Sequence, residues 1–311
     1  MINSIGISTE LTLNMHALNN EGSEGNQLQT REVTVVDESG NLRAVNAISG
    51  DMFKHMFVEH LQSLAVSNDL PLCEGCKQLR ASRSAVDEQF LRTFTGDNIE
   101  DVTKLIRHCV VDDAAGILVT AGNRSLPRKS VFEVGWVIGV PEKTRTESYF
   151  HVKYDLVNRG KGSENEANTG QNIFHRPASS GVYALVLNVD LYRIGQNNIS
   201  LDYVLDVPER AKRQKAVMEA VLFTFVKPTG AQRNTQLPHV VQARGSVSVS
   251  RGTVPAPVWS PLKTTYQADI KGVAEVLNRL HPNTVEVHSF DSLAQFAEIM
   301  EQLIAEDARG A

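Results

Sequence analysis

Residues 11–26 read LTLNMHALNNEGSEGN and residues 47–55 read AISGDMFKH, and these two stretches decide the fold predicted for the chain. The first begins as a strand and passes into a polar loop with two glycines, and the second opens a helix. Helix starts and glycine-exposed backbone amides attract anions, because their N–H groups point outward without partners. The order of strand, loop and helix therefore indicates a surface that can hold phosphates.

Residues 5–15 alternate between apolar and polar side chains, which predicts a strand with one buried face. The polar face runs from Gly6 to Asn14 and carries no aromatic side chain. An ordinary RNA-recognition motif (RRM) stacks bases on aromatic residues of its sheet. The strand therefore lacks the base-stacking surface of such a domain and suits contact with an RNA backbone.

The remaining patterns predict one α+β domain. Helices are expected at 49–66, 97–107, 208–225, 267–280 and 292–305, and strands at 32–36, 42–46, 117–120, 131–140, 182–191 and 284–288. A ferredoxin-like β-α-β-β-α-β core accounts for this succession if it carries long insertions. The insertions are expected at about 67–116 and about 141–180, with a mobile excursion over 158–172.

Composition narrows the class of protein. The chain has 311 residues, 41% of them hydrophobic, and a net charge of −5, which argues against binding nucleic acid by bulk charge alone. The basic clusters at 124–129 and 210–215 are either local contact surfaces or solvated faces. No apolar run approaches a membrane span and the N-terminus lacks a signal-peptide pattern, so we expect a soluble protein of the cytoplasm.

Three groups of residues resemble the DevR-type backbone subunit of the CRISPR type I Cascade complex, in the RAMP superfamily. The segments are 13–26 with 47–55, then CVVDDAAG at 109–116, and then NIFHR at 172–176 with SGVY at 180–183 and DLYRIG at 190–195. A loop at 230–234 lies where that family has a glycine-rich RNA-contacting loop. The resemblance covers about residues 5–260, and the segments are specific as a set.

The resemblance implies an RRM-like core, or palm, with a thumb-like β-hairpin among its insertions. In that family several copies line up along one guide RNA in a helical filament, and the guide pairs with target DNA in short segments. The chain is thus expected to be a non-catalytic subunit that binds CRISPR guide RNA (crRNA). Its other partners would be target DNA through the guide, copies of itself and further Cascade subunits. Each subunit covers few nucleotides, so a local basic strip suffices.

The resemblance and the residue types together nominate the RNA-binding residues. They lie at the end of the first strand, in the loop after it, at the start of the first long helix, beside the thumb and in the loop at 230–234. The nominated set is Asn14, His16, Asn19, Asn26, Ser49, Gly50, Lys54, His175, Arg176, Gly230, Gln232, Arg233 and Asn234. The competing interpretations are a solvated strand end, an ordinary helix N-cap with a surface lysine, and a plain polar turn.

The three cysteines form a separate signal. Cys73 and Cys76 have the spacing of a zinc knuckle, and Cys109 follows His108 directly. Three thiolates and one imidazole would complete a structural tetrahedral zinc site. The fourth ligand is open, because neighbouring residues in a strand point to opposite faces, and His55 or His60 are alternatives to His108. Free buried thiols and a redox pair also remain possible.

Catalysis is not expected. Related type III backbone subunits cleave RNA with an acidic residue in the loop after the first strand, but no aspartate precedes Asp37 here, and Glu21 and Glu24 are the only nearby carboxylates. A metal-dependent endoribonuclease of the same superfamily is the alternative. A metal role for Asp112 and Asp113 is less expected than capping or turn formation. A transcriptional regulator is a third reading, but no helix-turn-helix is evident.

Overall fold

The computed structural model describes residues 2–25, 27–121, 124–154, 171–230 and 233–310. The strands are β1 (Ser4–His16), β2 (Asn20–Glu24), β3 (Gln27–Thr30), β4 (Glu32–Val36), β5 (Leu42–Ile48), β6 (Ile117–Ala121), β7 (Arg124–Arg128), β8 (Phe132–Val134), β9 (Val137–Tyr154), β10 (Gln171–Val189), β11 (His239–Ser250) and β12 (Val285–Phe290). The helices are α1 (Gly50–Ser67), α2 (Glu74–Lys77), α3 (Glu88–Leu91), α4 (Asn98–His108), α5 (Val110–Ala115), α6 (Val207–Val226), α7 (Tyr266–Leu280) and α8 (Leu293–Gly310), with 3₁₀ turns at Arg83–Val86 and Leu191–Arg193. None of the helices in these ranges is both long and apolar enough to cross a bilayer.

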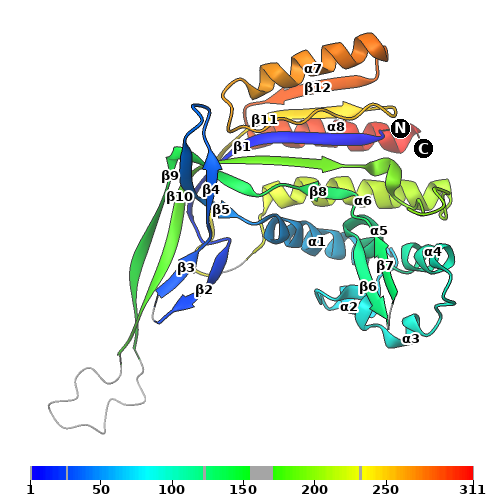
Figure 1. The fold of residues 1–311 in the computed structure, drawn as a ribbon, viewed down its shortest axis with the longest axis horizontal. Coiled ribbons are helices and arrows are strands. Elements are labelled where there is room, and N and C mark those ends of the chain that lie inside the picture. The colour runs from blue at the N-terminus through cyan, green and yellow to red at the C-terminus, as the bar shows by residue number, and fades with distance from the viewer. Residues whose placement is uncertain (1, 26, 122–123, 155–170, 231–232, 311) are drawn as a thin grey trace, which may run out of the picture.

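One large sheet organises the chain, with its strands in the order β12-β11-β1-β10-β9-β5-β4 (Figure 1). Strand β8 also pairs with β10. Along the chain, and with other elements between them, β1, α1, β8, β10, α6 and β11 come in the order strand, helix, strand, strand, helix and strand. All pairings along this path are antiparallel. The expectation of a mixed α+β protein is thus confirmed.

Strand β1 is buried on both faces, which corrects the expectation of a half-buried strand. Its polar residue Ser8 is 1% exposed, and its hydroxyl accepts a hydrogen bond from the backbone N–H of Trp259 at 3.0 Å. A Cβ atom added to Gly6 would lie 2.6 Å from the side chain of Val258. The small residues on this face therefore admit the chain after β11, which covers the surface that was expected to face RNA.

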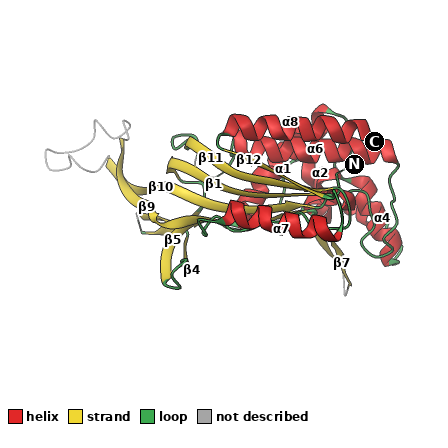
Figure 2. Cartoon of the chain, turned by 90° about the horizontal axis from the view of Figure 1, so that it is seen from above, coloured by secondary structure: helices red, strands yellow, loops and turns green. Residues whose placement is uncertain are grey.

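Two layers of helices enclose the sheet (Figure 2). Helices α1, α6 and α8 pack in a row on one face, with stacked rings of Phe57 and Phe132 4.1 Å apart in the core between α1 and β8. Helix α7 packs on β11 and β12 through a separate small cluster that includes Ala274 and Val285. The faces of the sheet are thus unequal, and only the first carries the main core.

Strands β9 and β10 have 18 and 19 residues, whereas β1, which lies beside β10 in the sheet, has 13, so both extend beyond the other strands. Their pairing runs continuously from Gln171 opposite Tyr154 to Gly181 opposite Thr144. A bulge follows at Gly181, whose φ is +150° and whose added Cβ would lie 2.2 Å from the carbonyl oxygen of Lys143. We call residues 141–154 and 171–180 the hairpin arm. The predicted excursion at 158–172 lies almost wholly outside the described residues.

The described residues of 68–121 and 124–130, between α1 and β8, form a compact unit that we call the insertion. It contains α2 to α5 and the β6–β7 hairpin, and a small core around Val102, Leu105 and Leu126. Figure 1 shows it on the side of α1 away from the hairpin arm. The insertion was expected to end near residue 116, but the chain returns to the main sheet only at β8.

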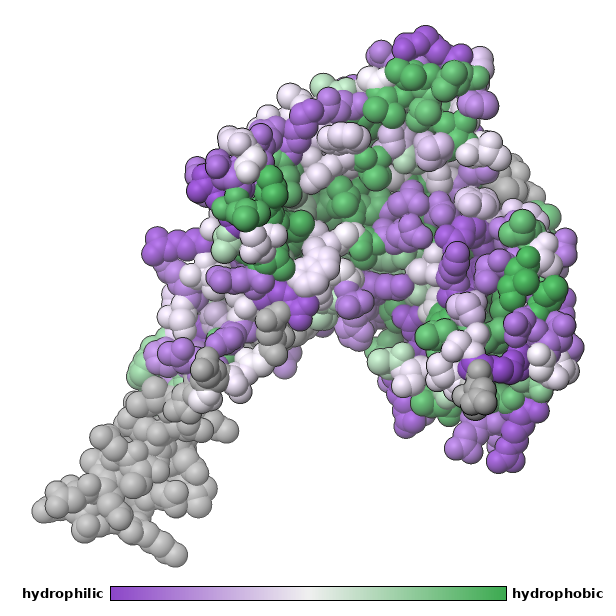
Figure 3. All heavy atoms as spheres, in the orientation of Figure 1, coloured by the Kyte–Doolittle hydropathy of each residue, from purple (hydrophilic) through white to green (hydrophobic). Residues whose placement is uncertain are grey.

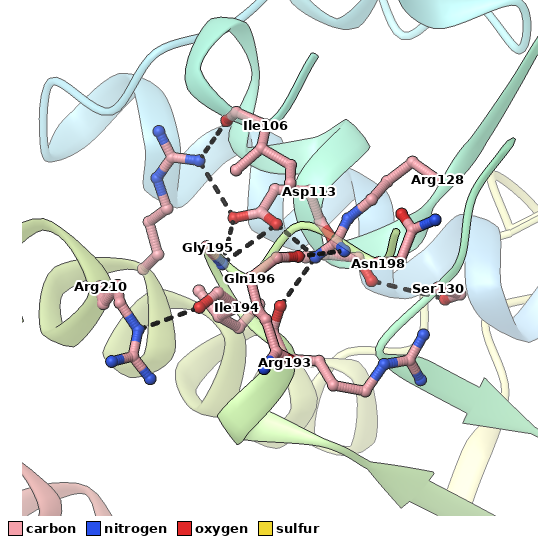
Figure 4. Close-up of polar contacts among 12 residues, drawn as sticks. Ile106, Asp113, Arg128, Ser130, Arg193, Ile194, Gly195, Gln196, Asn198 and Arg210 are labelled. Carbon is pink, nitrogen blue, oxygen red and sulfur yellow. Dashed lines mark hydrogen bonds and ion pairs between the residues drawn. The ribbon is translucent and has the colours of Figure 1, made fainter. Parts of the chain in front are cut away.

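The two basic clusters are partly buried, which corrects the simpler reading of solvated faces. Asp113, which is 0% exposed, accepts bonds from Arg128 at 2.6 Å and Arg213 at 3.1 Å. The backbone N–H of Gly195 donates to the same carboxylate at 3.1 Å (Figure 4). Burial lowers the pKa of Arg128, and the charge of Asp113 opposes that shift. We call Asp113, Arg128 and Arg213 the buried triad, which joins the insertion to α6.

Candidate nucleic-acid interface

Asn19 and Ser49 shape the start of α1. Ser49 is the N-cap, and its hydroxyl accepts a hydrogen bond from the backbone N–H of Met52 at 3.1 Å. The backbone N–H of Ser49 donates to Oδ1 of Asn19 at 2.8 Å, which ties the loop after β1 to the helix. Both side chains are 7% exposed, so their visible role is to position the first turn of α1. The neighbouring Gly50 packs closely, because an added Cβ would lie 3.0 Å from the carbonyl oxygen of Val134.

A cleft of about 850 Å³ lies between α1 and the insertion. Lys54 lines it from α1, and Arg80 and Arg83 line it from the insertion. Partial burial lowers the pKa of Lys54, and the charge of Arg83 lowers it further while that of Asp51 opposes the shift. Because an anion would stabilise cations that repel each other in a partly desolvated cleft, this arrangement suits a phosphate.

The polar loop after α6 lies against the start of α1. At Gly230 an added Cβ would come 3.0 Å from the side-chain methyl of Met56, 3.3 Å from that of Met52 and 3.4 Å from Leu18. The structure therefore brings together three regions that the sequence nominated separately. They are the loop after β1, the start of α1 and the loop around Gly230.

The same loop also reaches the root of the hairpin arm. Arg176 on β10 donates to the hydroxyl of Thr235 at 3.3 Å, and Gln236 donates to the carbonyl oxygen of Pro177 at 3.1 Å. The guanidinium of Arg176 also lies 4.8 Å from the ring centroid of Phe174. The nominated Arg176 of the hairpin arm thus contacts the chain directly after the nominated loop at 230–234.

Several buried polar atoms in this region have no hydrogen-bond partner among the described residues. They are Nε2 of His16, Nε of Arg176, Oγ1 of Thr229, Nε of Arg233 and Oε1 of Gln236. Buried polar groups in folded proteins nearly always have partners, and leaving one without a partner costs about 1–3 kcal/mol. A polar ligand at the root of the hairpin arm would satisfy such groups.

The nominated residues differ in their exposure to solvent. Asn14 and Asn234 are exposed, whereas His175 is half-buried, with its ring 5.8 Å from that of Phe150. His16 is 2% exposed and packs edge-on against Tyr183, and burial lowers its pKa to about 4. A neutral buried imidazole does not present a positive charge to a phosphate. Asn26 and Gln232 lie outside the described residues.

The cysteines meet at one point beneath the cleft. The sulfur atoms of Cys73, Cys76 and Cys109 and a carboxylate oxygen of Asp112 all lie within 4.8 Å of one another, and all four residues are buried. His108 is not among them, because its Nε2 lies 3.2 Å from Asp87. Its ring also stacks on Phe90 at 3.8 Å. The residue that lies beside the three sulfur atoms is thus Asp112 and not the expected His108.

The alternative histidines are also engaged elsewhere. Nε2 of His60 lies 2.9 Å from the carbonyl oxygen of Lys227, and that of His55 lies 3.0 Å from Glu59. Cys109 is both the C-cap of α4 and the N-cap of α5. Asp112 lies three positions later in α5 and therefore on the same side of that helix as Cys109. Burial raises the pKa of Asp112 to about 7, and the neighbouring Cys73 adds to the shift.

Comparison with known proteins agrees with the resemblance in the sequence. The family model described as "CRISPR-associated negative auto-regulator DevR/Csa2" matches residues 7–271. The chain belongs to the DevR/Csa2 family. A CRISPR-associated protein Cas7/Csa2 of Saccharolobus solfataricus is 25% identical over 251 residues, which are 76% of each chain. A Cas7/Cst2/DevR protein of Methanocaldococcus jannaschii is 23% identical over 80% of this chain and 82% of its own.

The fold of this DevR/Csa2 protein is also found in solved structures. A chain of a "CRISPR RNA-guided surveillance complex, pre-nicking" superposes with a TM-score of 0.54 over 98% of this chain and 99% of its own, at 16% identity. This likeness concerns the fold alone. Sequence reasoning missed the basic residues Arg80 and Arg83, because an isolated arginine in an irregular segment carries no periodic signal.

Proposed function

We propose that this chain is a non-catalytic backbone subunit of a type I Cascade surveillance complex. It binds CRISPR guide RNA, oligomerises along the spacer part of the guide, and supports recognition of target DNA through base pairing by the guide. In this proposal the core of β1, α1, β8, β10, α6 and β11 is the RRM-like palm, and the hairpin arm is the thumb. The proposal rests on family membership and on the site.

The observation that carries the proposal is the convergence at the start of α1. The loop after β1, the loop around Gly230 and the root of the hairpin arm meet there, and buried polar atoms in that region have no partner among the described residues. Figure 3 shows the molecule recessed between the side that carries the hairpin arm and the insertion. The amide, hydroxyl and guanidinium groups of this region fit contact with a sugar–phosphate backbone.

Lys54, Arg80 and Arg83 would supply the charge for this interface. Each subunit needs to neutralise only a few phosphates, so the net charge of −5 does not oppose binding. His16 and Asn19 would act from beneath by holding the loop and the helix in place, whereas Lys54, Arg176 and Arg233 would contact RNA. Base identity would be left to pairing between guide and target.

Purification with the guide RNA tests the proposal. The chain is expressed with its guide and purified in moderate salt, and its 260/280 nm absorbance ratio and mass are measured before and after ribonuclease treatment. We expect bound RNA that is protected at a regular spacing and a mass of several subunits. A 34.2 kDa monomer without RNA, even when the companion subunits are co-expressed, would refute the proposal.

A cleavage assay tests the non-catalytic part. Radiolabelled guide RNA is incubated with the wild-type protein and Mg²⁺ or Mn²⁺, beside a variant with Glu21→Gln and Glu24→Gln. We expect no metal-dependent products from either protein. Cuts at a regular interval that disappear in the variant would instead establish an endoribonuclease.

A further inference from the structure

We propose that Cys73, Cys76, Cys109 and Asp112 bind one zinc ion, which fastens the insertion to the core. The four ligand atoms lie within 4.8 Å of one another, and the four side chains are 0–2% exposed. A tetrahedral site with metal–sulfur distances of about 2.3 Å places its ligand atoms roughly 3.8 Å apart. A small contraction of the cluster around the ion therefore gives that geometry.

The backbone around Cys73 and Cys76 has the form of a metal knuckle. Cys73 caps the short helix α2, and its sulfur accepts a hydrogen bond from the backbone N–H of Cys76 at 3.3 Å. Such a bond stabilises a thiolate. Between them, Gly75 is fixed by packing, because an added Cβ would lie 2.1 Å from the carbonyl oxygen of Arg83. Both sulfurs are thus held toward Cys109 by the backbone itself.

The carboxylate of Asp112 is the second, independent observation. Its Oδ2 accepts a hydrogen bond from the hydroxyl of Ser84, while Oδ1 lies 3.9 Å from the sulfur of Cys76. No ion pair is found for Asp112 within the described part of the chain. The next residue, Asp113, is equally buried but has two arginines and a backbone N–H. The charge of Arg83 acts on Asp112 only from a distance, without an ion pair between them in the described residues. A buried carboxylate that faces three thiols in this way is accounted for by a bound metal ion.

The ligand set favours zinc over other ions. Thiolates select soft or borderline metals, and hard ions such as Mg²⁺ and Ca²⁺ prefer sites built from oxygen alone. Four protein ligands leave no open position, so the site is structural. Ser84 would orient Asp112 from outside, as hydrogen-bonded partners of metal ligands commonly do.

The position of the zinc site in the fold indicates how the ion would affect the insertion. Cys73 and Cys76 lie at the start of the insertion and Cys109 and Asp112 at the junction of α4 and α5, and the three cysteines belong to the main core that includes Phe57 and Leu61 of α1. The ion would therefore join the start of the insertion to the α4–α5 junction and hold both against α1. This fixes the wall of the cleft that carries Arg80 and Arg83.

The first test is the metal content of the wild-type protein, made in zinc-supplemented medium and purified without chelators. We expect about one zinc per chain by mass spectrometry of the metal, released when a mercurial reagent modifies the thiols. Replacement by Co²⁺ should give the visible absorption of a tetrahedral thiolate site. Protein that contains no zinc, and whose three thiols react freely in the native state, would overturn the proposal.

Variants then separate the two possible fourth ligands, with zinc affinity measured by competition with a chromogenic chelator. We expect Ser84→Ala to weaken binding roughly 10–100-fold and Asp112→Asn to weaken it by at least as much. His108→Ala is the matched control and should leave affinity unchanged, since His108 pairs with Asp87. Loss of zinc in His108→Ala with full retention in Asp112→Asn would overturn the assignment of Asp112.

Discussion

Replacing Asp113 with asparagine tests how much the buried triad contributes to stability. Asp113 is 0% exposed, and its oxygens lie 2.6 Å from Nη2 of Arg128 and 3.1 Å from Nη1 of Arg213. Asparagine keeps the size of the side chain but removes the charge. Among the described residues this leaves the buried Arg128 without an ion pair and the buried Arg213 with only the partly exposed Glu209, at 2.9 Å. Breaking a buried ion pair in this way costs about 3–5 kcal/mol, because the remaining charge stays desolvated.

A loss of that size is a large part of the free energy of unfolding of an ordinary domain, about 5–15 kcal/mol. Urea titration of the full chain, followed by circular dichroism, measures it as a lower midpoint with an unchanged slope. Asp37→Asn is the matched control. Its partner Arg43 is 42% exposed at the side chain, so loss of this pair should lower the urea midpoint far less than loss of the buried pair.

A compensating variant separates the effect of charge from that of packing. Adding Arg213→Met to Asp113→Asn removes one of the two buried cations that Asp113 neutralises, so we expect part of the lost stability to return. If Asp113→Asn unfolds at the same urea concentration as the wild type, the triad does not stabilise the junction between the insertion and α6, and the reasoning fails.

Three further predictions follow from single residues. Lys54→Ala should weaken guide RNA binding in a filter-binding assay and reduce its salt dependence by about 0.7 in the log–log slope. The control Lys271→Ala, at an exposed position of α7, should change neither, and equal losses in the two variants would contradict the interface. Burial lowers the pKa of His16 from its ordinary value of 6.5 to about 4, so between pH 6.5 and pH 4 the imidazole takes up a proton only in the unfolded chain. The free energy of unfolding should therefore fall by up to roughly 3 kcal/mol as the pH decreases from 6.5 to 4. In His16→Gln the urea midpoint should depend less on pH over this range. Gly272→Ala on α7 should raise the free energy of unfolding by up to about 1 kcal/mol, because an added Cβ there meets nothing within 4 Å. Gly245→Ala should instead lower the thermal midpoint markedly, because its added Cβ would lie 2.1 Å from the carbonyl oxygen of Ser8.

Elements with a local signal could be predicted from the sequence. Helix α6 begins after an aspartate N-cap and has a proline in its first turn. Its predicted range of 208–225 differs from the observed Val207–Val226 by one residue at each end. Strand β11 was not anticipated. Its alternation of serine and valine at 246–250 was a usable signal, but both kinds of side chain are buried there, so the pattern does not mark an inner and an outer face.

Contacts between distant segments could not be predicted in this way. Arg128 and Arg213 belong to basic clusters that are ordinarily solvated, and they are buried because Asp113 lies between them in space. The choice of His108 as a zinc ligand followed from its place beside Cys109. The structure places a change of helix at Cys109, which turns His108 outward and Asp112 inward.

The pairing of β1 with β10 and β11 has a consequence for synthesis on the ribosome. The hydroxyl of Thr9 on β1 donates to the carbonyl oxygen of Arg244 on β11, 235 positions later in the chain. At translation rates of about 5–20 residues per second, the first strand waits on the order of 10 to 50 s for that neighbour. Its other neighbour, β10 (Gln171–Val189), is also made late, so the apolar side chains of β1 lack their final partners for most of this time. The nascent chain is therefore exposed to aggregation and would benefit from a chaperone that shields this strand.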